Sequence, residues 1–374
     1  MIGVSILAAR RTAVMPKKGA FGALCIADLA RDVILATLGD AGLTVGDVDE
    51  LIVSNALGAG GNPARICALA AGLPLRVAGL SIDRQCLGGL DAVLLGQAMI
   101  SSGQAQIVVV GGVESYSQRP LRATQFSDGR PPAPYLRPPF TPWADRDPDL
   151  HVAADLTART AQISRSVQDA WAQSSHAKAQ VRASQGWPEI VPLIGQRCDG
   201  FTRPLSPKLL ARARVLSGSI TVANCAIEAD GAAFLVLASA ARAQKHTQSG
   251  HCGPLGPMHI TSGVSLGGDP SEPALAPIAA IRRALDLAVL TPKDIDLVEM
   301  MEAYAAQAIA CCAPFDFEPA LINVAGGALA RGHPIGASGA ILAVRLFHEL
   351  ARGYGLAAIA AAGGLGSAVI FQRP

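Results

Sequence analysis

Aromatic and charged side chains are scarce in this chain of 374 residues. Phe, Trp and Tyr make up 4% of the sequence and charged residues 16%, with a formal net charge of +2. So few aromatic rings argue against the base-stacking surfaces of proteins that bind single-stranded nucleic acid. So small a net charge gives no electrostatic attraction to nucleic acid or to an anionic membrane. We therefore expect neither of these as a partner.

Long apolar runs and cysteines at the CxxC spacing are missing as well. The longest weakly polar stretch, residues 355–371, is mostly Gly and Ala and is too short to span a bilayer comfortably. The first residues, MIGVSILAARRT, place their basic residues after an apolar run, the reverse of a secretory signal peptide. The eight cysteines include no CxxC spacing, so neither a metal site nor a disulfide framework is expected. We expect a soluble, cytoplasmic protein with reduced thiols.

Half of the residues are hydrophobic, which supports a large buried core in two domains or one duplicated domain. The pattern Leu-Thr-x-x-Asp-Val/Ile-Asp begins at residue 43 and again at residue 290, each time between an amphipathic helix and a short strand. A predicted strand that ends in Gly-Gly recurs at residues 111 and 363. The two offsets nearly agree (290 − 43 = 247 and 363 − 111 = 252). We infer an internal duplication of two α/β halves.

The first half carries a candidate nucleophile. In GLSIDRQCLGGLDAV, residues 79–93, a short strand is predicted to lead through a tight turn, with Cys86 at its apex, into a helix. A helix N-terminus stabilises negative charge, so we expect this position to lower the pKa of the thiol. A buried, inert cysteine is the commoner role for any single Cys, and the turn alone does not decide between the two.

The second half carries a candidate base at the corresponding place. The offset of the duplication leads from Cys86 to INVAGGALARGHPIGASGA, residues 322–340, which again predicts a strand, a glycine-rich turn and a helix. His333 lies near the start of that helix. Pseudo-twofold packing of the halves would bring thiol and imidazole together, and such a pair generates a thiolate nucleophile. We predict that Cys86 and His333 are catalytic, although a purely structural histidine is the alternative for His333 taken alone.

A segment of different character interrupts the first half. Prolines are dense between Pro120 and Asp149, which predicts an extended and irregular chain. Two helices are predicted next, one from His151 to about Gln162 and one after Ser164 as N-cap. The predicted domains are an N-terminal half of residues 1–119 and 216–248, an inserted loop domain of residues 120–215, and a C-terminal half of residues 249–374.

With these motifs the chain closely resembles the thiolase family, of the acetyl-CoA acetyltransferase and 3-ketoacyl-CoA thiolase type, nearly end to end. The shared motifs are the sequence around Cys86, NPAR (62–65), GGVES (111–115), DGAA (230–233), EAYAAQ (302–307) and NVAGGALARGHPIGASGA (323–340). The resemblance implies an α/β protein of the thiolase fold, whose duplicated halves form a five-layer α/β/α/β/α core with an inserted loop domain over coenzyme A. It also implies an acyltransferase of lipid metabolism that acts on a coenzyme A thioester without a further cofactor, as a homodimer or homotetramer.

The resemblance also assigns roles to individual residues. Cys86 matches the acyl-accepting nucleophile and His333 matches the histidine of the GHPIG motif. The backbone N–H groups of Cys86 and Ala362 match one oxyanion hole. His151 matches a loop-domain histidine beside pantetheine, and Arg203 an arginine near the nucleotide end of coenzyme A, so both are expected to bind the coenzyme.

Three positions depart from the family pattern. Ala360 stands where the family has a second catalytic cysteine, the acid/base that removes the α-proton of acetyl-CoA. Met301 replaces the asparagine that anchors a water in the other oxyanion hole, and Ala226 replaces a serine that commonly contacts pantetheine. Acyl-enzyme formation keeps its nucleophile, base and N–H donors. Condensation loses a base, worth about 10²–10⁴-fold, and an oxyanion donor, worth about 10²–10³-fold.

Three functions follow from these residues. The first is an acyltransferase that loads Cys86 from an acyl-CoA and passes the acyl group to a carbon nucleophile, which is decarboxylated, already acidic, or deprotonated by His333. The second is a conventional β-ketothiolase with a relocated base, for which Cys225, Cys311 and Cys312 are candidates. The third is a CoA-ester-binding subunit with vestigial chemistry. No motif names the acyl chain, the acceptor or the pathway.

Overall fold

The computed structural model of the chain describes residues 3–58, 60–248 and 255–374. Within these residues ten strands join in one sheet, in the order β12-β13-β14-β11-β1-β10-β5-β3-β4, with the short β2 (Met15–Pro16) beside β10. The other strands are β1 (Val4–Arg11), β3 (Glu50–Ser54), β4 (Leu80–Ile82), β5 (Ile107–Glu114), β10 (Ala229–Ser239), β11 (Met258–Gly267), β12 (Ile295–Met300), β13 (Gly353–Ala361) and β14 (Leu365–Arg373).

The two halves of this sheet repeat each other, which confirms the duplication. The order β3-β5-β10-β1 in the first half corresponds to β12-β13-β14-β11 in the second, and a parallel bridge between Val298 and Ile322 takes the place of β4. The repeated Leu-Thr-x-x-Asp pattern forms the same capping box around a 3₁₀ turn at Thr44–Asp47 and at Thr291–Asp294. The halves join where β1 pairs antiparallel with β11, with Ser5 opposite His259.

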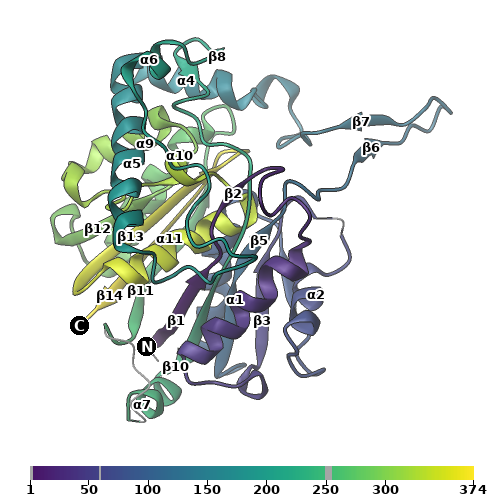
Figure 1. Cartoon of the computed structure of the whole chain (residues 1–374), viewed down its shortest axis with the longest axis vertical. Helices are drawn as coiled ribbons and strands as arrows, with labels where there is room; N and C mark the ends of the chain where they lie inside the picture. Colours follow the sequence, from purple (N-terminus) through teal and green to yellow (C-terminus); the bar gives the residue numbers. More distant parts are fainter. Residues whose placement is uncertain (1–2, 59, 249–254) are drawn as a thin grey trace.

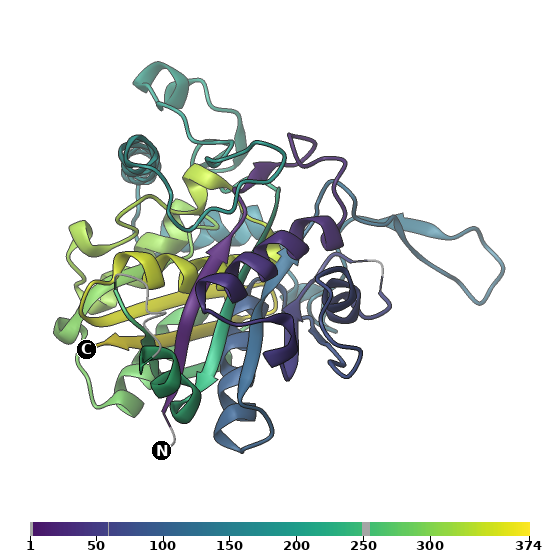
Figure 2. The same cartoon turned by 60° about the horizontal axis from the view of Figure 1, so that its bottom comes forward.

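Helices cover both faces of each half-sheet and make five layers (Figures 1 and 2). Helices α1 (Ile26–Asp40) and α2 (Pro63–Ala70) pack on the outer face of the N-terminal half, and α8 (Ala276–Ala288) and α9 (Ala305–Cys312) on that of the C-terminal half. Between the half-sheets lie α3 (Gly88–Ser101) and α11 (Ile335–Glu349).

Strand β5 illustrates why its residues suit a central strand. Successive side chains of a strand point to opposite faces. Val108 and Val110 therefore enter the core around α3 and α11, whereas Val109 enters the core under α1 and α2. Apolar side chains are needed on both faces because both are covered, and the run Ile-Val-Val-Val supplies them.

The inserted segment has more regular structure than its prolines indicate. Its expected irregular part contains an antiparallel hairpin of β6 (Arg122–Thr124) and β7 (Ala133–Tyr135), which projects away from the rest of the protein (Figure 1), so that expectation was wrong in part. The later elements of this segment are α4 (Leu150–Thr160), α5 (Arg165–Gln185) and α6 (Pro207–Ala211), and β8 (Val215–Ser217) lies at its end. The remaining short elements lie outside it and are β9 (Ile220–Thr221), α7 (Ala240–Gln248) and α10 (Ala328–Arg331).

Side-chain capping starts the two predicted helices of this segment. The N–H groups of His151 and Val152 donate to Asp149 Oδ1 at the start of α4. Ser164 caps α5, as predicted, by accepting a hydrogen bond from the N–H of Val167. The domain boundaries at residues 119/120 and 215/216 stay a prediction.

Candidate active site

The N-terminal ends of α3 and α11 meet in the middle layer. Glycines make their close crossing possible, because a Cβ on Gly89 would lie 2.2 Å from the backbone nitrogen of Ala340, and one on Gly339 would lie 2.6 Å from that of Leu90. Cys86 lies in the 3₁₀ turn just before α3, and His333 lies just before α11. The crossing of the two related helices therefore brings the two turns together.

The thiol and the imidazole are in contact, as the duplication predicts. Cys86 Sγ lies 3.1 Å from His333 Nε2. On the other side of the ring, His333 Nδ1 lies 2.6 Å from Ser338 Oγ, and the Ser338 hydroxyl donates to the carbonyl oxygen of Pro334. Because that hydroxyl proton is already engaged, Ser338 Oγ accepts from Nδ1–H. Nε2 is then the unprotonated nitrogen that faces the thiol.

The turn that carries Cys86 is strained at a position the sequence gave no reason to single out. Gln85 has a φ of 52°, a left-handed conformation that costs a non-glycine residue on the order of 1–3 kcal/mol. The N–H of Gln85 donates to Asp83 Oδ1 at 2.9 Å, which holds the turn. Strain of this kind is common where a reactive side chain must be held in one direction.

Burial determines the protonation of the pair. Loss of water raises the pKa of Cys86 to about 12, against the effect of its backbone hydrogen bond, and the charges of Glu114 and Asp83 add to the rise. Burial, together with the charge of Arg331, lowers the pKa of His333 to about 4. The expectation of a lowered thiol pKa was therefore wrong, because desolvation outweighs the helix N-terminus. At neutral pH the resting pair is a thiol beside a neutral imidazole.

This resting state has a spectroscopic consequence. Wild-type protein and Cys86→Ala are expected to show the same far-ultraviolet thiolate absorbance at neutral pH. The rate of Cys86 acylation should fall on acidification only near pH 4, where His333 becomes protonated and can no longer accept the thiol proton. A thiolate signal at neutral pH that disappears in Cys86→Ala would contradict this assignment.

A buried carboxylate fixes the loop that carries His333. Glu114, in the motif GGVES, accepts hydrogen bonds from the N–H groups of Gly336 and Ala56 at 3.1 and 2.9 Å and from the amide of Asn55 at 2.8 Å. Burial raises its pKa to about 7 despite these backbone donors. Glu114 thus ties the end of β5 to the start of α11 and sets the position of the imidazole.

The end of β13 packs against the turn of Cys86. Ala360 is 9% exposed, and Met301 is 1% exposed and belongs to the same apolar cluster as Ala361. These side chains bring no acid, base or hydrogen-bond donor to the site. The role of the Cys86 and Ala362 N–H groups as an oxyanion hole stays a prediction.

Of the other cysteines considered as bases, two lie elsewhere. Cys311 and Cys312 belong to the core on the outer face of the C-terminal half, and Cys311 Sγ donates to the carbonyl oxygen of Ala274. Cys225 instead forms a backbone bridge with Tyr304. Only Cys225 among these three adjoins a segment that reaches the Cys86–His333 pair.

The two predicted coenzyme A ligands have different surroundings. His151 lies in α4, which packs against α9, and its Nδ1 is 3.0 Å from Tyr304 Oη. The guanidinium of Arg203 packs 3.9 Å from the ring centroid of Phe201 and donates to the carbonyl oxygen of the same residue. Their roles in binding coenzyme A stay predictions.

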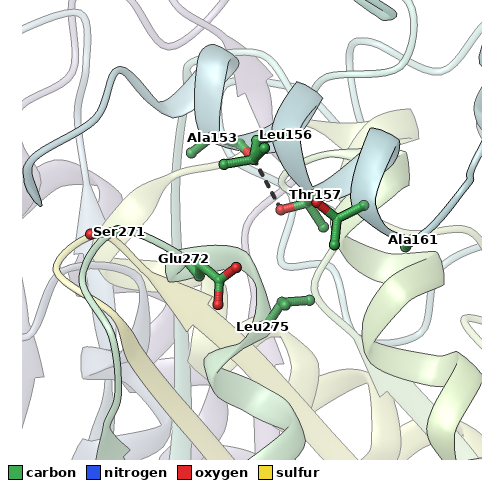
Figure 3. Close-up of a pocket in the computed structure, with 8 residues that line it drawn as sticks. Ala153, Leu156, Thr157, Ala161, Ser271, Glu272 and Leu275 are labelled. Carbon is green, nitrogen blue, oxygen red and sulfur yellow. Dashed lines mark hydrogen bonds between the residues drawn. The ribbon is translucent and has the colours of Figure 1, made fainter.

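A small cavity of about 80 Å³ lies between α4 and the turn before α8 (Figure 3). Its lining residues are Ala153, Leu156, Thr157, Thr160, Ala161, Ser271, Glu272 and Leu275. An open groove of about 550 Å³ lies between α3 and β11 and is lined by Arg84 and Asp91 among others. Neither Cys86 nor His333 lines the cavity or the groove, although the groove reaches Asp83 and Arg84 in the turn that carries Cys86. Within the described residues, no group of three His, Cys, Asp or Glu side chains is placed to hold a metal ion.

A thiol and an imidazole held in contact between two duplicated halves form an arrangement that suits covalent catalysis through an acylated cysteine. Family models place the chain more narrowly, since Thiolase, N-terminal domain matches residues 4–241 and Thiolase, C-terminal domain matches residues 257–373. The chain belongs to the thiolase family.

Relatives and solved structures agree with this assignment. A putative acetyl-CoA C-acetyltransferase, YhfS of Bacillus subtilis, is 40% identical over 87% of each chain. An acetyl-CoA acetyltransferase of Cupriavidus necator is 37% identical over 100% of both. The crystal structure of the Bacillus anthracis acetyl-CoA acetyltransferase matches with a TM-score of 0.90 and 30% identity, over 100% of this chain and 99% of that one. Human mitochondrial 3-ketoacyl-CoA thiolase in complex with CoA matches with the same TM-score and identity, over 100% and 98%.

The part of the chain that the structure describes contains no helix with the length and apolar character needed to cross a membrane.

Proposed function

We propose that this protein forms an acyl-enzyme at Cys86 from an acyl-CoA and transfers the acyl group to a carbon nucleophile. The observation that carries the proposal is the 3.1 Å contact between Cys86 Sγ and His333 Nε2. The substrate class is supported by relatives that are named acetyl-CoA acetyltransferases and by the CoA complex of a protein with the same fold. His151 and Arg203 are the proposed coenzyme ligands.

In the first half-reaction His333 acts as general base. Nε2 takes the thiol proton as Cys86 Sγ attacks the thioester carbonyl, and a carbon–sulfur bond forms. The carbonyl electrons move to oxygen, which the N–H groups of Cys86 and Ala362 stabilise. When the tetrahedral intermediate collapses, the bond to the sulfur of coenzyme A breaks, and the leaving thiolate takes the proton from the His333 imidazolium.

In the second half-reaction, the transfer of the acyl group from Cys86 to the acceptor, we propose a departure from ordinary thiolase chemistry. Ala360 supplies no base for the α-carbon of an acceptor thioester, and Met301 supplies no anchor for a polarising water. An acceptor that loses CO₂, is already acidic, or is deprotonated by the neutral His333 avoids the missing cysteine. We therefore propose slow condensation of two unactivated acyl-CoA molecules.

A conventional β-ketothiolase with a relocated base is the second candidate function, favoured by the names of the relatives. Its base would be Cys225, since Cys311 and Cys312 lie in a separate core. Burial raises the pKa of Cys225 to about 12, as it does for Cys86, but Cys86 contacts the imidazole of His333 whereas the Cys225 thiol donates to the carbonyl oxygen of Ala226. We therefore prefer the first proposal.

Intact-mass measurement tests the proposed function. After mixing with a panel of acyl-CoA thioesters, the wild-type protein is expected to gain the mass of one acyl group, and Cys86→Ala is expected to gain none. Cys198→Ala, which removes an exposed thiol, serves as the control and should be acylated like the wild type. An absence of adduct with every thioester would instead identify a binding subunit without chemistry.

The proposed role of Arg203 is also testable. Arg203→Ala is expected to weaken the binding of coenzyme A more than that of dephospho-CoA or a pantetheine ester, because a guanidinium at the nucleotide end would face the phosphate. Arg130→Ala, in the β6–β7 loop, is a matched control that removes a basic side chain elsewhere. Equal weakening of all three ligands by Arg203→Ala in calorimetric titrations would mean that the arginine is only structural.

We also propose a homodimer or homotetramer, a cytoplasmic location and a role in lipid metabolism, all by analogy with the family. Light scattering of the purified protein tests the oligomeric state directly.

A further inference from the structure

One polar side chain beside the Cys86–His333 pair has no role in the mechanism above. Tyr304 is the N-cap residue of α9 and one of four tyrosines in the chain. The segment 225–228 connects it to the site, because Cys225 forms a backbone bridge with Tyr304, and Glu228 forms one with His333. Tyr304 and His333 therefore flank the same short extended segment.

The Tyr304 hydroxyl is held by a second residue. Its Oη lies 3.0 Å from His151 Nδ1, and the two rings meet edge to face with centroids 5.7 Å apart. A phenol donates one hydrogen bond and also accepts at its oxygen. In the tautomer of His151 that carries its proton on Nδ1, Nδ1–H donates to that oxygen, and the O–H of Tyr304 hydrogen-bonds to the sulfur of Cys225. A thiol sulfur is a weak acceptor, so an enolate oxygen is a stronger partner for this O–H and displaces the sulfur from it.

The protonation of Tyr304 suits a donor and not a base. Burial raises its pKa well above 10, and the charges of Cys225, Asp149 and Cys86 raise it further. The phenol therefore keeps its proton at physiological pH. The influence of Cys86 on Tyr304 also means that the hydroxyl lies within electrostatic reach of the reactive sulfur.

The apolar side chains around the site include no hydrogen-bond donor for the oxygen of a second thioester. Ala226, Met301 and Ala360 are apolar side chains of the segments around the site, so none of them stabilises negative charge on a second thioester. Cleavage or formation of a carbon–carbon bond next to a thioester passes through an enolate, whose oxygen needs a hydrogen-bond donor.

We propose that Tyr304 is a catalytic hydrogen-bond donor to the enolate oxygen of the coenzyme A thioester, and that His151 is its positioning residue. The proposal rests on the proposed function, because the enolate forms only opposite an acyl group on Cys86. It makes Tyr304 specific to the carbon–carbon step, whereas acylation by a simple thioester involves no enolate.

The carbon–carbon step is easily isolated with acetoacetyl-CoA. His333 takes the proton of Cys86, and Sγ attacks the C3 carbonyl of the substrate. The C2–C3 bond then breaks, and its electron pair forms the enolate of acetyl-CoA, with its oxygen bound by Tyr304. The imidazolium of His333 returns the proton to C2, which leaves acetyl-CoA and acetylated Cys86.

The test compares two routes to the same acetyl-enzyme. The rate of Cys86 acetylation is measured by quenched-flow intact mass, once with acetyl-CoA and once with acetoacetyl-CoA, and the ratio of the second rate to the first is taken. Direct acetoacetyl transfer gives a heavier adduct and is counted separately. Tyr304→Phe is expected to lower the ratio by about 10²–10³-fold, the usual effect of removing one oxyanion donor.

Three further variants separate a chemical role from a structural one. Tyr354→Phe, which removes a hydroxyl from β13 where it accepts from Gln372, should leave the ratio as in the wild type. His151→Ala should lower the ratio through loss of Tyr304 positioning. His151→Asn should recover part of it, since its amide can occupy the place of Nδ1.

The outcomes are distinct. An unchanged ratio in Tyr304→Phe overturns the role of Tyr304, and so does a wild-type protein that acetylates from acetyl-CoA but never from acetoacetyl-CoA. A wild-type protein that gains no acyl group from these two substrates or from any other thioester of the panel overturns the proposed function itself.

Discussion

His333→Ala is expected to slow the acylation of Cys86 by about 10²–10⁴-fold, the usual contribution of a general base. The reason is that the buried thiol, with a pKa raised to about 12, cannot ionise in advance and must lose its proton to Nε2 during the attack. Single-turnover acylation by acetyl-CoA, followed by intact mass, measures the effect. The loss should become smaller at high pH, where hydroxide competes as base.

Two variants on the same helix provide the controls. Ser338→Ala removes the oxygen that accepts from Nδ1 and should cause a smaller loss, because the imidazole stays in place but loses its orientation. His348→Ala removes an imidazole further along α11 that contacts the carbonyl oxygen of Ala9, outside the site. If His333→Ala is acylated as fast as His348→Ala, then His333 is structural and another base must serve Cys86.

Ala360→Cys is expected to raise the condensation of two acetyl-CoA molecules by about 10²–10⁴-fold, because it restores an acid/base at the end of β13. Acylation of Cys86 should change little, since its nucleophile, base and N–H donors are untouched. A coupled assay of acetoacetyl-CoA formation measures the gain. Ala360→Ser, of similar size but without a thiol of suitable pKa, is the matched control.

Met301→Asn, which restores the second family residue, extends this prediction to the enolate donor. Met301 is buried in an apolar cluster, so an unpaired amide there should lower the free energy of unfolding by about 1–3 kcal/mol. If Tyr304 already donates to the enolate oxygen, adding Met301→Asn to Ala360→Cys should change the rate of acetoacetyl-CoA formation little. In a protein that also carries Tyr304→Phe, the same addition should raise that rate. A wild-type protein that condenses acetyl-CoA at ordinary enzyme rates, on the order of 1–10³ s⁻¹, would contradict the whole argument.

The duplication and the pairing of Cys86 with His333 could be predicted from the sequence because both follow from local sequence patterns. Capping boxes, strand alternation and glycine turns depend on neighbours within a few residues, and they recur at one offset. Two related helices that cross at Gly89 and Gly339 then place equivalent turns together. The family motifs also predicted the thiolase fold. The hairpin β6–β7 within the proline-rich segment was missed, because proline argues against a central strand but is accepted in an exposed edge strand.

By itself, then, the sequence determined the two α/β halves, the thiolase fold and the identity of the thiol and imidazole that meet. Only the tertiary structure decided their charge, because the pKa of Cys86 depends on how completely the packed halves exclude water, and no local pattern encodes that quantity. The tertiary structure alone also showed that Tyr304 contacts His151 and that Cys311 and Cys312 lie outside the site. These contacts join segments far apart in the chain, and their geometry exists only once the helices α4, α9 and α11 have packed.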